Sequence, residues 1–316
     1  MGRLVIVACT NVGRYIIEEI MRNPNIKTEI AGVVDLNAQR AVSKANYDSY
    51  SDLAVKYGLP VFYCDNVNDR DCLDFIADKK PDLILQTGWS QKFRDELLSI
   101  PKYGCIGEHP APLPKGRGAA CINWAILTDE REWGDTFFQM VKEYDKGVIY
   151  AQSFFRIEEY DDVFTVYEKV AACAARTVRE NMDKWTAGEF CPIAQDDSLA
   201  TYYKKRTPAD GQIRDFSKPA KELHDFIRAQ ARPYPCAFFM RNGEKVMILS
   251  SAVRKGEYTD AEAGTVVSAG EGCISVACRG GEILELRRLQ LEGRPSQWAD
   301  SFLEEAEGAV GSPLIL

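Results

Sequence analysis

Imidazole chemistry has few candidates in this chain, because its 316 residues include two histidines, His109 and His224. His109 lies in the segment 107–118, which holds three prolines and three glycines in twelve residues. That composition opposes regular structure and predicts a fixed loop, in which an imidazole with an ordinary pKa of about 6.5 suits proton transfer at neutral pH. The alternative for His109 is a structural hydrogen bond. His224 is predicted to lie on the solvated face of a helix.

Two further segments place polar groups where a site can form. Asp145 lies in the turn 143–147 between two predicted strands, where its carboxylate can be held against a neighbour; the alternative is an ordinary surface turn. The loop 86–89 directly follows the predicted strand 81–85. Ligands of open parallel sheets bind at the carboxyl ends of the strands, so this loop is a predicted docking place for a flat ligand.

The ten cysteines are scattered through apolar segments, which predicts reduced, buried thiols. Cys273 and Cys278 are the closest pair, and alternation along a strand puts them on opposite faces. No Cys-x-x-Cys spacing occurs. We therefore predict neither a disulfide framework nor a metal site.

The elements that must position these groups follow from the apolar pattern. The first half alternates short apolar runs with amphipathic helices, which predicts an α/β fold with a Rossmann-like, open, mostly parallel sheet and helices on both faces. The predicted strands are 4–8, 30–34, 60–62, 81–85, 105–106, 137–141 and 148–155. The predicted helices are 12–21, 51–57, 71–78, 119–127 and 163–185.

Periodicity is lost in the polar stretch 192–206, where we place a domain boundary. The predicted domains are a catalytic domain, 1–205, and a C-terminal domain, 206–316. The second has one amphipathic helix, 219–230, and five short strands at 238–240, 246–252, 264–267, 274–278 and 283–291. Five short strands with glycine-containing turns predict a small closed β-barrel like the oligonucleotide/oligosaccharide-binding (OB) fold.

Composition narrows the function classes. Hydrophobic residues make up 46% and charged residues 27%, as in globular proteins, and the net charge of −8 opposes a broad grip on nucleic acid phosphates. No apolar run approaches the roughly 20 residues of a membrane span, so we expect a cytoplasmic protein with no membrane partner. The loop after the first strand, Cys9 to Gly13, lacks the spaced glycines of a dinucleotide site. A nicotinamide or flavin oxidoreductase is therefore kept only as an alternative.

Several motifs together resemble one enzyme family. The run 109–127, HPAPLPKGRGAACINWAIL, and the turn Asp145-Lys146-Gly147 are similar to the signature segment and the Asp-x-Gly turn of the 10-formyltetrahydrofolate-dependent formyltransferases. Towards the C-terminus, KRTPADG at 205–211, IRA at 227–229, PYPCAFF at 233–239, GTV at 264–266 and LQLEG at 289–293 resemble that family's small barrel domain. The resemblance covers nearly the whole chain, with its motifs in the family's order.

The resemblance implies formyl transfer from 10-formyltetrahydrofolate to a primary amine, without a metal. By similarity, His109 polarises the formyl oxygen or shuttles the proton, and Asp145 orients and charge-tunes the imidazole or accepts the proton. The implied folate-binding residues are Thr87, Gly88, Trp89, Tyr144, Lys146 and Gly147. The implied acceptor-binding residues are Glu108, Pro110, Arg117 and Asn123. Arg117 suits a diphosphate, and its alternative role is to hold the loop together.

One departure from the family concerns the reaction itself. The family typically has an asparagine two positions before the histidine, completing an Asn-His-Asp set, and this chain has Gly107 there. Losing one oxyanion donor costs about 100- to 1,000-fold in rate when nothing replaces it. The resemblance thus leaves open a catalytically impaired homologue that binds folate or a nucleotide.

The acceptor is not fixed by these motifs. We expect the amine of a nucleotide-linked amino sugar, and methionyl-tRNA is the alternative. Residues 206–316 hold 14 Lys and Arg against 16 Asp and Glu, so no basic RNA-binding domain is evident. A homodimer is kept open.

Overall fold

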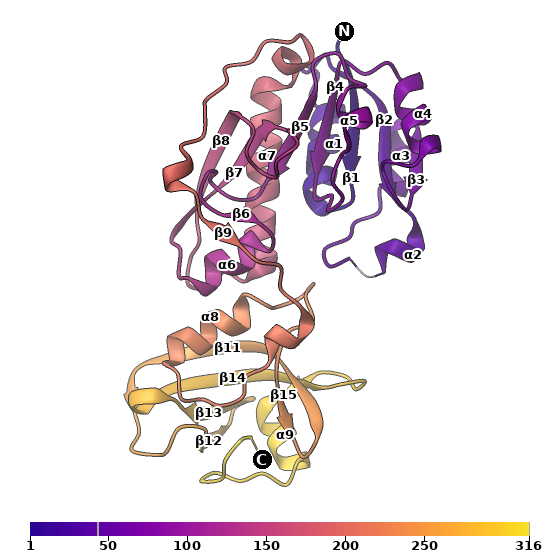
Figure 1. Cartoon of the computed structure of the whole chain (residues 1–316). Coiled ribbons are helices and arrows are strands. Elements are labelled where there is room, and N and C mark those ends of the chain that lie inside the picture. Colours follow the sequence, from indigo (N-terminus) through magenta and orange to yellow (C-terminus); the bar gives the residue numbers. More distant parts are fainter. Residues whose placement is uncertain (43, 316) are drawn as a thin grey trace. The chain divides into compact units, whose positions relative to one another are not determined.

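The apolar runs of the first half form a seven-stranded sheet in the computed structural model, which describes residues 1–42 and 44–315 (Figure 1). The strand order is β3-β2-β1-β4-β5-β7-β8. The first five strands are parallel, and β7 and β8 are antiparallel additions. The bounds are β1 (Arg3–Ala8), β2 (Glu29–Leu36), β3 (Val61–Cys64), β4 (Leu83–Thr87), β5 (Cys105–His109), β7 (Glu132–Gln139) and β8 (Ile149–Arg156). The expected open, mostly parallel α/β sheet is confirmed.

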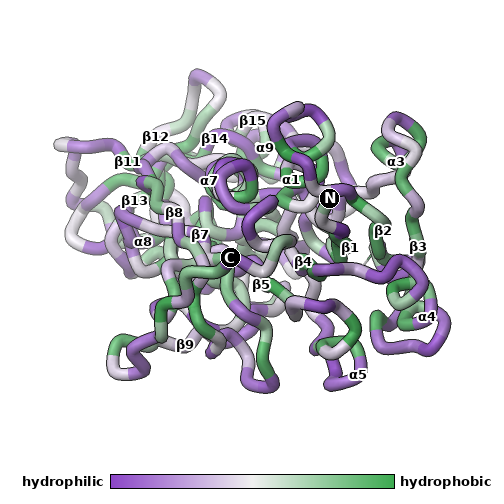
Figure 2. The backbone as a smooth tube through the Cα atoms, turned by 90° about the horizontal axis from the view of Figure 1, so that it is seen from above, coloured by the Kyte–Doolittle hydropathy of each residue, from purple (hydrophilic) through white to green (hydrophobic). Residues whose placement is uncertain are grey.

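Helices cover both faces of this sheet. The helices of the first 186 residues are α1 (Asn11–Arg22), α2 (Ala38–Ala41), α3 (Ser51–Tyr57), α4 (Arg70–Asp78), α5 (Asp95–Leu98), α6 (Cys121–Leu127) and α7 (Val163–Thr186). Residues of α4 and α5 pack with Val5, Val7 and other residues of one face into a buried cluster. On the other face α1 and α7 lie together, since Asn11 of α1 bonds Glu168 of α7. Figure 2 shows hydrophobic colour along the strands and hydrophilic colour at peripheral loops such as the one beside α4.

Two predicted strands were misplaced. The strand expected at 105–106 continues through His109, because Gly107, Glu108 and His109 pair with β7. The strand expected at 137–141 begins instead at Glu132. Pairing with a neighbouring strand thus overrides the weak strand propensity of glycine and glutamate. As a result His109 is the last residue of a strand, not part of the irregular loop that we predicted.

The chain divides into two compact units. The N-terminal unit is Met1–Cys121, Arg131–Ile157 and Thr165–Lys205, and the C-terminal unit is Ile122–Glu130, Glu158–Phe164 and Arg206–Leu316. Most of α6 therefore groups with the C-terminal unit, although it follows the signature loop in sequence. In the N-terminal unit, the two-residue strands β6 (Arg117–Gly118) and β9 (Tyr202–Tyr203) pair with each other.

The C-terminal unit contains an antiparallel sheet with the strand order β10-β11-β14-β13-β12, and β15 adds to β14. Its elements are α8 (Ala220–Arg228), β10 (Ala237–Arg241), β11 (Glu244–Tyr258), β12 (Val266–Gly270), β13 (Cys273–Ala277), β14 (Glu282–Leu291), β15 (Gln297–Trp298) and α9 (Ala299–Glu305). The five expected strands are all present, whereas β15 and α9 were not predicted. Along the described residues the ladder does not join β12 to β10, so closure into a barrel stays a prediction.

Eight of the ten cysteines are buried, as expected for core thiols, while Cys191 is exposed and Cys273 is half-buried. Within residues 1–42 and 44–315, no helix has the length and apolarity required to cross a bilayer.

Candidate active site

The imidazole of His109 is held at the end of β5 by two constraints. The strand ladder pairs His109 with Thr136 of β7, and the ring is 8% exposed. The proline-rich loop then returns, so that the Gly116 carbonyl lies 2.8 Å from His109 Nε2. Thr136 Oγ1 pins this loop by donating to the Ala111 carbonyl at 2.6 Å. A backbone ladder and a fixed loop therefore orient the ring together.

These contacts decide the protonation of His109. The Gly116 carbonyl can only accept, so His109 Nε2 carries a proton, and His109 Nδ1 lies 3.9 Å from Asp145 Oδ1. Burial alone lowers the pKa of this imidazole. The hydrogen bond and charge of the Cys121 sulfur, the Asp145 carboxylate and the Gly116 carbonyl outweigh burial and raise the pKa to about 10. At neutral pH the ring is therefore an imidazolium, which can polarise an oxygen or donate a proton.

Asp145 is held in a strained turn between β7 and β8. Its backbone φ is +58°, its side chain is 14% exposed, and its Oδ2 accepts a 2.8 Å bond from the Gly118 N–H. Glycine is required two residues later, at Gly147, because a Cβ there would lie 1.7 Å from the Gln139 carbonyl oxygen. The expected pairing of His109 with Asp145 is therefore present, as an electrostatic contact longer than a hydrogen bond.

Arg117 is buried and fully engaged within the N-terminal unit. It is 1% exposed, and its guanidinium donates to Gln195 Oε1 at 2.7 and 3.1 Å and to Tyr202 Oη at 2.8 Å, with Asp197 Oδ1 at 2.7 Å. Gln195 Nε2 in turn donates to the carbonyls of Asp145 and Gly147 at 2.8 and 2.7 Å. The arrangement favours the alternative role, in which Arg117 holds the signature loop and the Asp145 turn together.

The loop after β4 is rigid, and its indole is not exposed. Trp89 is 7% exposed and belongs to the core cluster on the α4 face, while Gln86 Nε2 donates to its carbonyl at 2.9 Å. Gly88 has a φ of +61°, and Cys9 Sγ donates to its carbonyl at 3.2 Å. Thr87 is completely buried. These side chains leave the backbone, and not an aromatic face, as the surface that this loop offers to a ligand.

Two other residues of the predicted folate set lie in the turn before β8. Tyr144 is 63% exposed, and the ammonium of Lys92 lies 5.4 Å from the centre of its ring. Lys146 is also exposed. Both side chains are accessible to a ligand, in contrast to the buried Trp89.

The other predicted acceptor-binding residues are buried or half-buried, each within its own unit. Glu108 is 5% exposed and, being next to His109 in a strand, faces the opposite side of the sheet. Pro110 is half-buried, and its carbonyl accepts from Trp133 Nε1 at 2.8 Å. Asn123 belongs to the C-terminal unit, where it is 2% exposed and donates to the Ala229 carbonyl at 2.6 Å.

The position of the missing family asparagine is occupied from the neighbouring strand. A Cβ on Gly107 would lie 2.8 and 2.9 Å from ring carbons of Phe138 and 3.2 Å from Met140 Cγ. Phe138 is 6% exposed and packs with Leu113 and Ile149. A side chain at Gly107 is thus excluded unless the phenyl ring moves.

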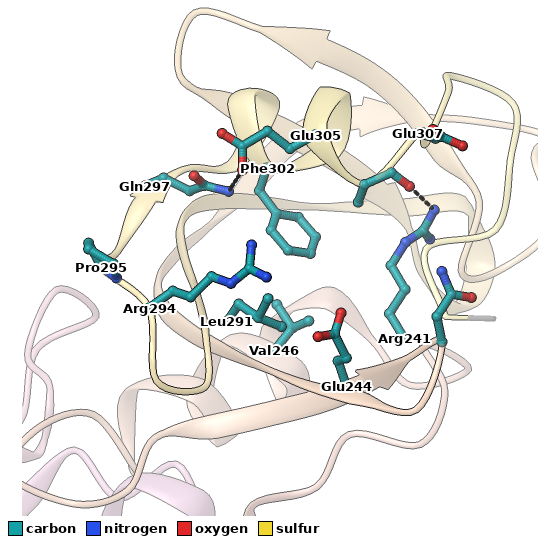
Figure 3. Close-up of a pocket in the computed structure, with 12 residues that line it drawn as sticks. Arg241, Glu244, Val246, Leu291, Arg294, Pro295, Gln297, Phe302, Glu305 and Glu307 are labelled. Carbon is teal, nitrogen blue, oxygen red and sulfur yellow. Dashed lines mark hydrogen bonds between the residues drawn. The ribbon is translucent and has the colours of Figure 1, made fainter.

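The C-terminal unit holds two further candidates, His224 and a surface hollow. The prediction that His224 is solvated is wrong: it is half-buried, its Nδ1 lies 2.9 Å from Ser251 Oγ, and burial lowers its pKa. The hollow has a volume of about 310 Å³, and the Arg294 side chain extends into it beside Leu291 and Val246 (Figure 3). Its charged lining mixes arginines with glutamates, which does not suit a polyanion.

Some of the site could not be read from the sequence. The Gly116 carbonyl and the Gln195 amide act through contacts across 7 and about 50 residues of chain, and neither residue type is distinctive.

Comparisons with known proteins agree with the geometry. Residues 5–181 match the family model described as "Formyl transferase", and residues 205–307 match "Formyl transferase, C-terminal domain". A methionyl-tRNA formyltransferase of Geotalea uraniireducens is 34% identical over 262 residues, which are 83% of this chain and 82% of that protein.

Solved structures share the fold. WlaRD, a sugar 3N-formyl transferase crystallised with dTDP and 5-N-formyl-THF, superposes with a TM-score of 0.67 at 17% identity, covering 93% of this chain and 99% of that chain. HypX from Aquifex aeolicus in complex with tetrahydrofolic acid gives a TM-score of 0.67 at 18% identity over 98% of this chain. This chain spans 48% of the HypX chain, about half of its length.

Proposed function

Because the chain belongs to the formyl transferase family and is therefore a formyltransferase, we propose that it transfers the formyl group of 10-formyltetrahydrofolate to the primary amine of a nucleotide-linked amino sugar. The observation that carries the transfer chemistry is the buried His109 ring, whose Nε2 lies 2.8 Å from the Gly116 carbonyl and whose Nδ1 lies 3.9 Å from Asp145 Oδ1.

The protonated ring of His109 and the carboxylate of Asp145 have different roles in the proposed reaction. When an amine attacks a formyl carbon, negative charge develops on the formyl oxygen, and a preorganised cation in a dry site stabilises it. His109 fills that role as an N–H donor. With Cys121, Asp145 raises the pKa of the ring, and its carboxylate, 3.9 Å from His109 Nδ1, takes up the proton released by the amine. The bond between the formyl carbon and the folate nitrogen then breaks, and that nitrogen takes the proton.

The site lacks the family's asparagine, and Phe138 occupies the space that its side chain would need. In our proposal the charge of His109 compensates for the missing donor, because a charged donor is about twice as strong as a neutral one. An impaired homologue that binds folate without turnover is the alternative supported by Gly107.

The sugar acceptor is supported by the charges of the C-terminal unit. At least seven of its fourteen Lys and Arg side chains form ion pairs with carboxylates. These carboxylates neutralise positive charge that would otherwise attract RNA phosphates. The seven are Lys218, Lys221, Arg228, Lys245, Arg254, Lys255 and Arg287. Methionyl-tRNA is the second candidate, because the 34% identical relative carries that name.

The test is an assay with 10-formyltetrahydrofolate and three acceptors: a panel of nucleotide-linked amino sugars, the same sugars without the nucleotide, and methionyl-tRNA. Tetrahydrofolate release and the mass of the acceptor are followed together. We expect a mass gain of one formyl group on a nucleotide-linked sugar. Formylation of methionyl-tRNA alone would refute the sugar acceptor, and folate binding without any product would support the impaired homologue.

Cytoplasmic location and a homodimer stay predictions. The first rests on the absence of a membrane-length apolar run in the sequence, and cell fractionation tests it. The second is tested by light scattering of the purified chain.

A further inference from the structure

A pair of carboxyl groups lies inside the N-terminal unit, on the sheet face opposite His109. Glu108 is the penultimate residue of β5 and is 5% exposed, and Asp135 of β7 is completely buried. In the ladder Glu108 faces Phe137, so Asp135 is its diagonal neighbour on the same face. At that separation a glutamate side chain can reach an aspartate on the next strand.

The pair is short of donors. Thr87 Oγ1 donates to Glu108 Oε2 at 2.5 Å, whereas Glu108 Oε1 and both carboxylate oxygens of Asp135 accept no hydrogen bond. The other titratable groups facing Asp135 are the thiols of Cys173 on α7 and Cys121 at the start of α6, and neither is a cation. Among the described residues no basic side chain neutralises the pair.

Two ionised carboxylates cannot share such a place, since each loses its hydration and repels the other. A single proton removes one charge and supplies the missing donor between them, because the register makes the two carboxyl groups diagonal neighbours on one face of adjacent strands. Burial raises the pKa of Asp135 well above its usual range, and the charge and hydrogen bond of Glu108 raise it further. The proton is therefore retained near neutrality.

We propose that Glu108 and Asp135 share one proton, and that this acid pair positions the loop 87–89 for folate through the hydroxyl of Thr87. Thr87 ends β4, and its hydroxyl donates to the carboxylate that the shared proton keeps in place. When the proton is lost, the two ionised carboxylates repel each other, and this repulsion moves Glu108 away from Thr87. Glu108 and Asp135 are thus positioning residues, and the folate part of this inference rests on the proposed function.

The protonation itself can be tested without turnover. The infrared spectrum of the purified protein at about pH 7.5 is expected to contain the carbonyl band of a buried carboxylic acid, which Asp135→Asn removes. The matched control is Asp35→Asn, because Asp35 is another completely buried aspartate of the same sheet, with a pKa raised to about 6 by burial. Asp35 is ionised at this pH, so its variant keeps the band. Absence of the band from the wild type overturns the shared proton.

The positioning role is tested by the dissociation constant of 5-formyltetrahydrofolate between about pH 6 and pH 9. For the wild type we expect it to rise by up to about tenfold per pH unit once the shared proton is lost. Asp135→Asn and Glu108→Gln each replace the proton with an amide N–H, so both are expected to bind folate independently of pH. Glu108→Ala removes the acceptor of Thr87 and is expected to bind at least about tenfold more weakly at every pH.

Identical pH profiles for the wild type and Asp135→Asn would overturn the positioning role. No folate binding by the wild type at any pH would instead refute the proposed function, and the infrared band would still decide whether the proton is shared.

Discussion

Gly107→Asn restores the family's asparagine and is expected to destabilise the protein without restoring a faster reaction. The new Cβ would lie 2.8 and 2.9 Å from ring carbons of Phe138, closer than side chains approach in folded proteins. The ring cannot swing into solvent, because Phe138 is 6% exposed and packs between Leu113 and Ile149. Overpacking of this kind costs about 1–3 kcal/mol, and a buried amide without partners adds a comparable cost.

The free energy of unfolding is measured in urea, and the formyl-transfer rate is measured on the same samples. Gly58→Asn is the matched control, since Gly58 is a left-handed helix cap with no atom within 4 Å of an added Cβ, and asparagine tolerates that conformation. We expect the control to lose less than about 1 kcal/mol. Gly107→Ala introduces the same Cβ without an amide, so the ratio of its rate to that of Gly107→Asn isolates the effect of the amide.

A second variant tests the cause of the destabilisation. Phe138→Ala alone is expected to cost about 3–5 kcal/mol, because it leaves a cavity. Combined with Gly107→Asn it should cost less than the sum of the two, by about 0.5–3 kcal/mol, since the asparagine then occupies the vacated space. Strict additivity, or a Gly107→Asn variant as stable as the wild type and faster by the roughly 100-fold that one oxyanion donor supplies, would refute the reasoning.

The remaining predictions concern the site and the core. His109→Ala is expected to abolish formyl transfer while leaving the circular dichroism spectrum unchanged, and the wild-type rate should fall as the pH rises through about 10, where the imidazolium loses its proton. Arg117→Lys is expected to lower the free energy of unfolding by about 1.5–3 kcal/mol, because lysine lacks the forked donors; a raised acceptor KM at unchanged stability would instead mark Arg117 as a substrate ligand. Burial raises the pKa of Asp35 from 3.8 to about 6, so the folded state binds this proton more tightly than the unfolded state does. The free energy of unfolding should therefore fall by up to about 1.4 kcal/mol per pH unit as the pH rises from about 3.8 to about 6. Asp35→Asn should remove this slope in urea titrations at several pH values.

Much of the sheet could be predicted, because its strands are apolar runs separated by helices of clear period. Ser51–Tyr57 was expected at those bounds, and the long helix Val163–Thr186 was expected to within one residue. The bounds that were predicted wrongly are those of strands whose length depends on hydrogen bonding to a neighbouring strand. Gly107 and Glu108 are poor strand formers followed by a proline, and they extend β5 only because β7 lies beside them.

In the candidate site, the choice of residues could be predicted from the sequence, whereas the contacts that orient them could not. The choice of His109 and its pairing with Asp145 followed from motif order, and the structure places the two groups 3.9 Å apart. The contacts that fix their geometry are not local: Gln195 bonds the Asp145 turn from a segment without periodic pattern. A single sequence carries no signal for such a contact, since one glutamine in a polar stretch resembles any other.

The extension of β5 changes what holds the imidazole. Were His109 part of a loop, its orientation would depend on the prolines alone. As the last residue of a strand it is fixed by the ladder to Thr136, while the loop contributes the Gly116 carbonyl. Alternation along the same strand then forces Glu108 to the opposite face, where it accepts from Thr87 and is the diagonal neighbour of Asp135. One strand thus carries His109 on one face and a member of the carboxyl pair on the other. Substitutions in the pair are therefore expected to change the affinity for folate more than they change the protonation of His109.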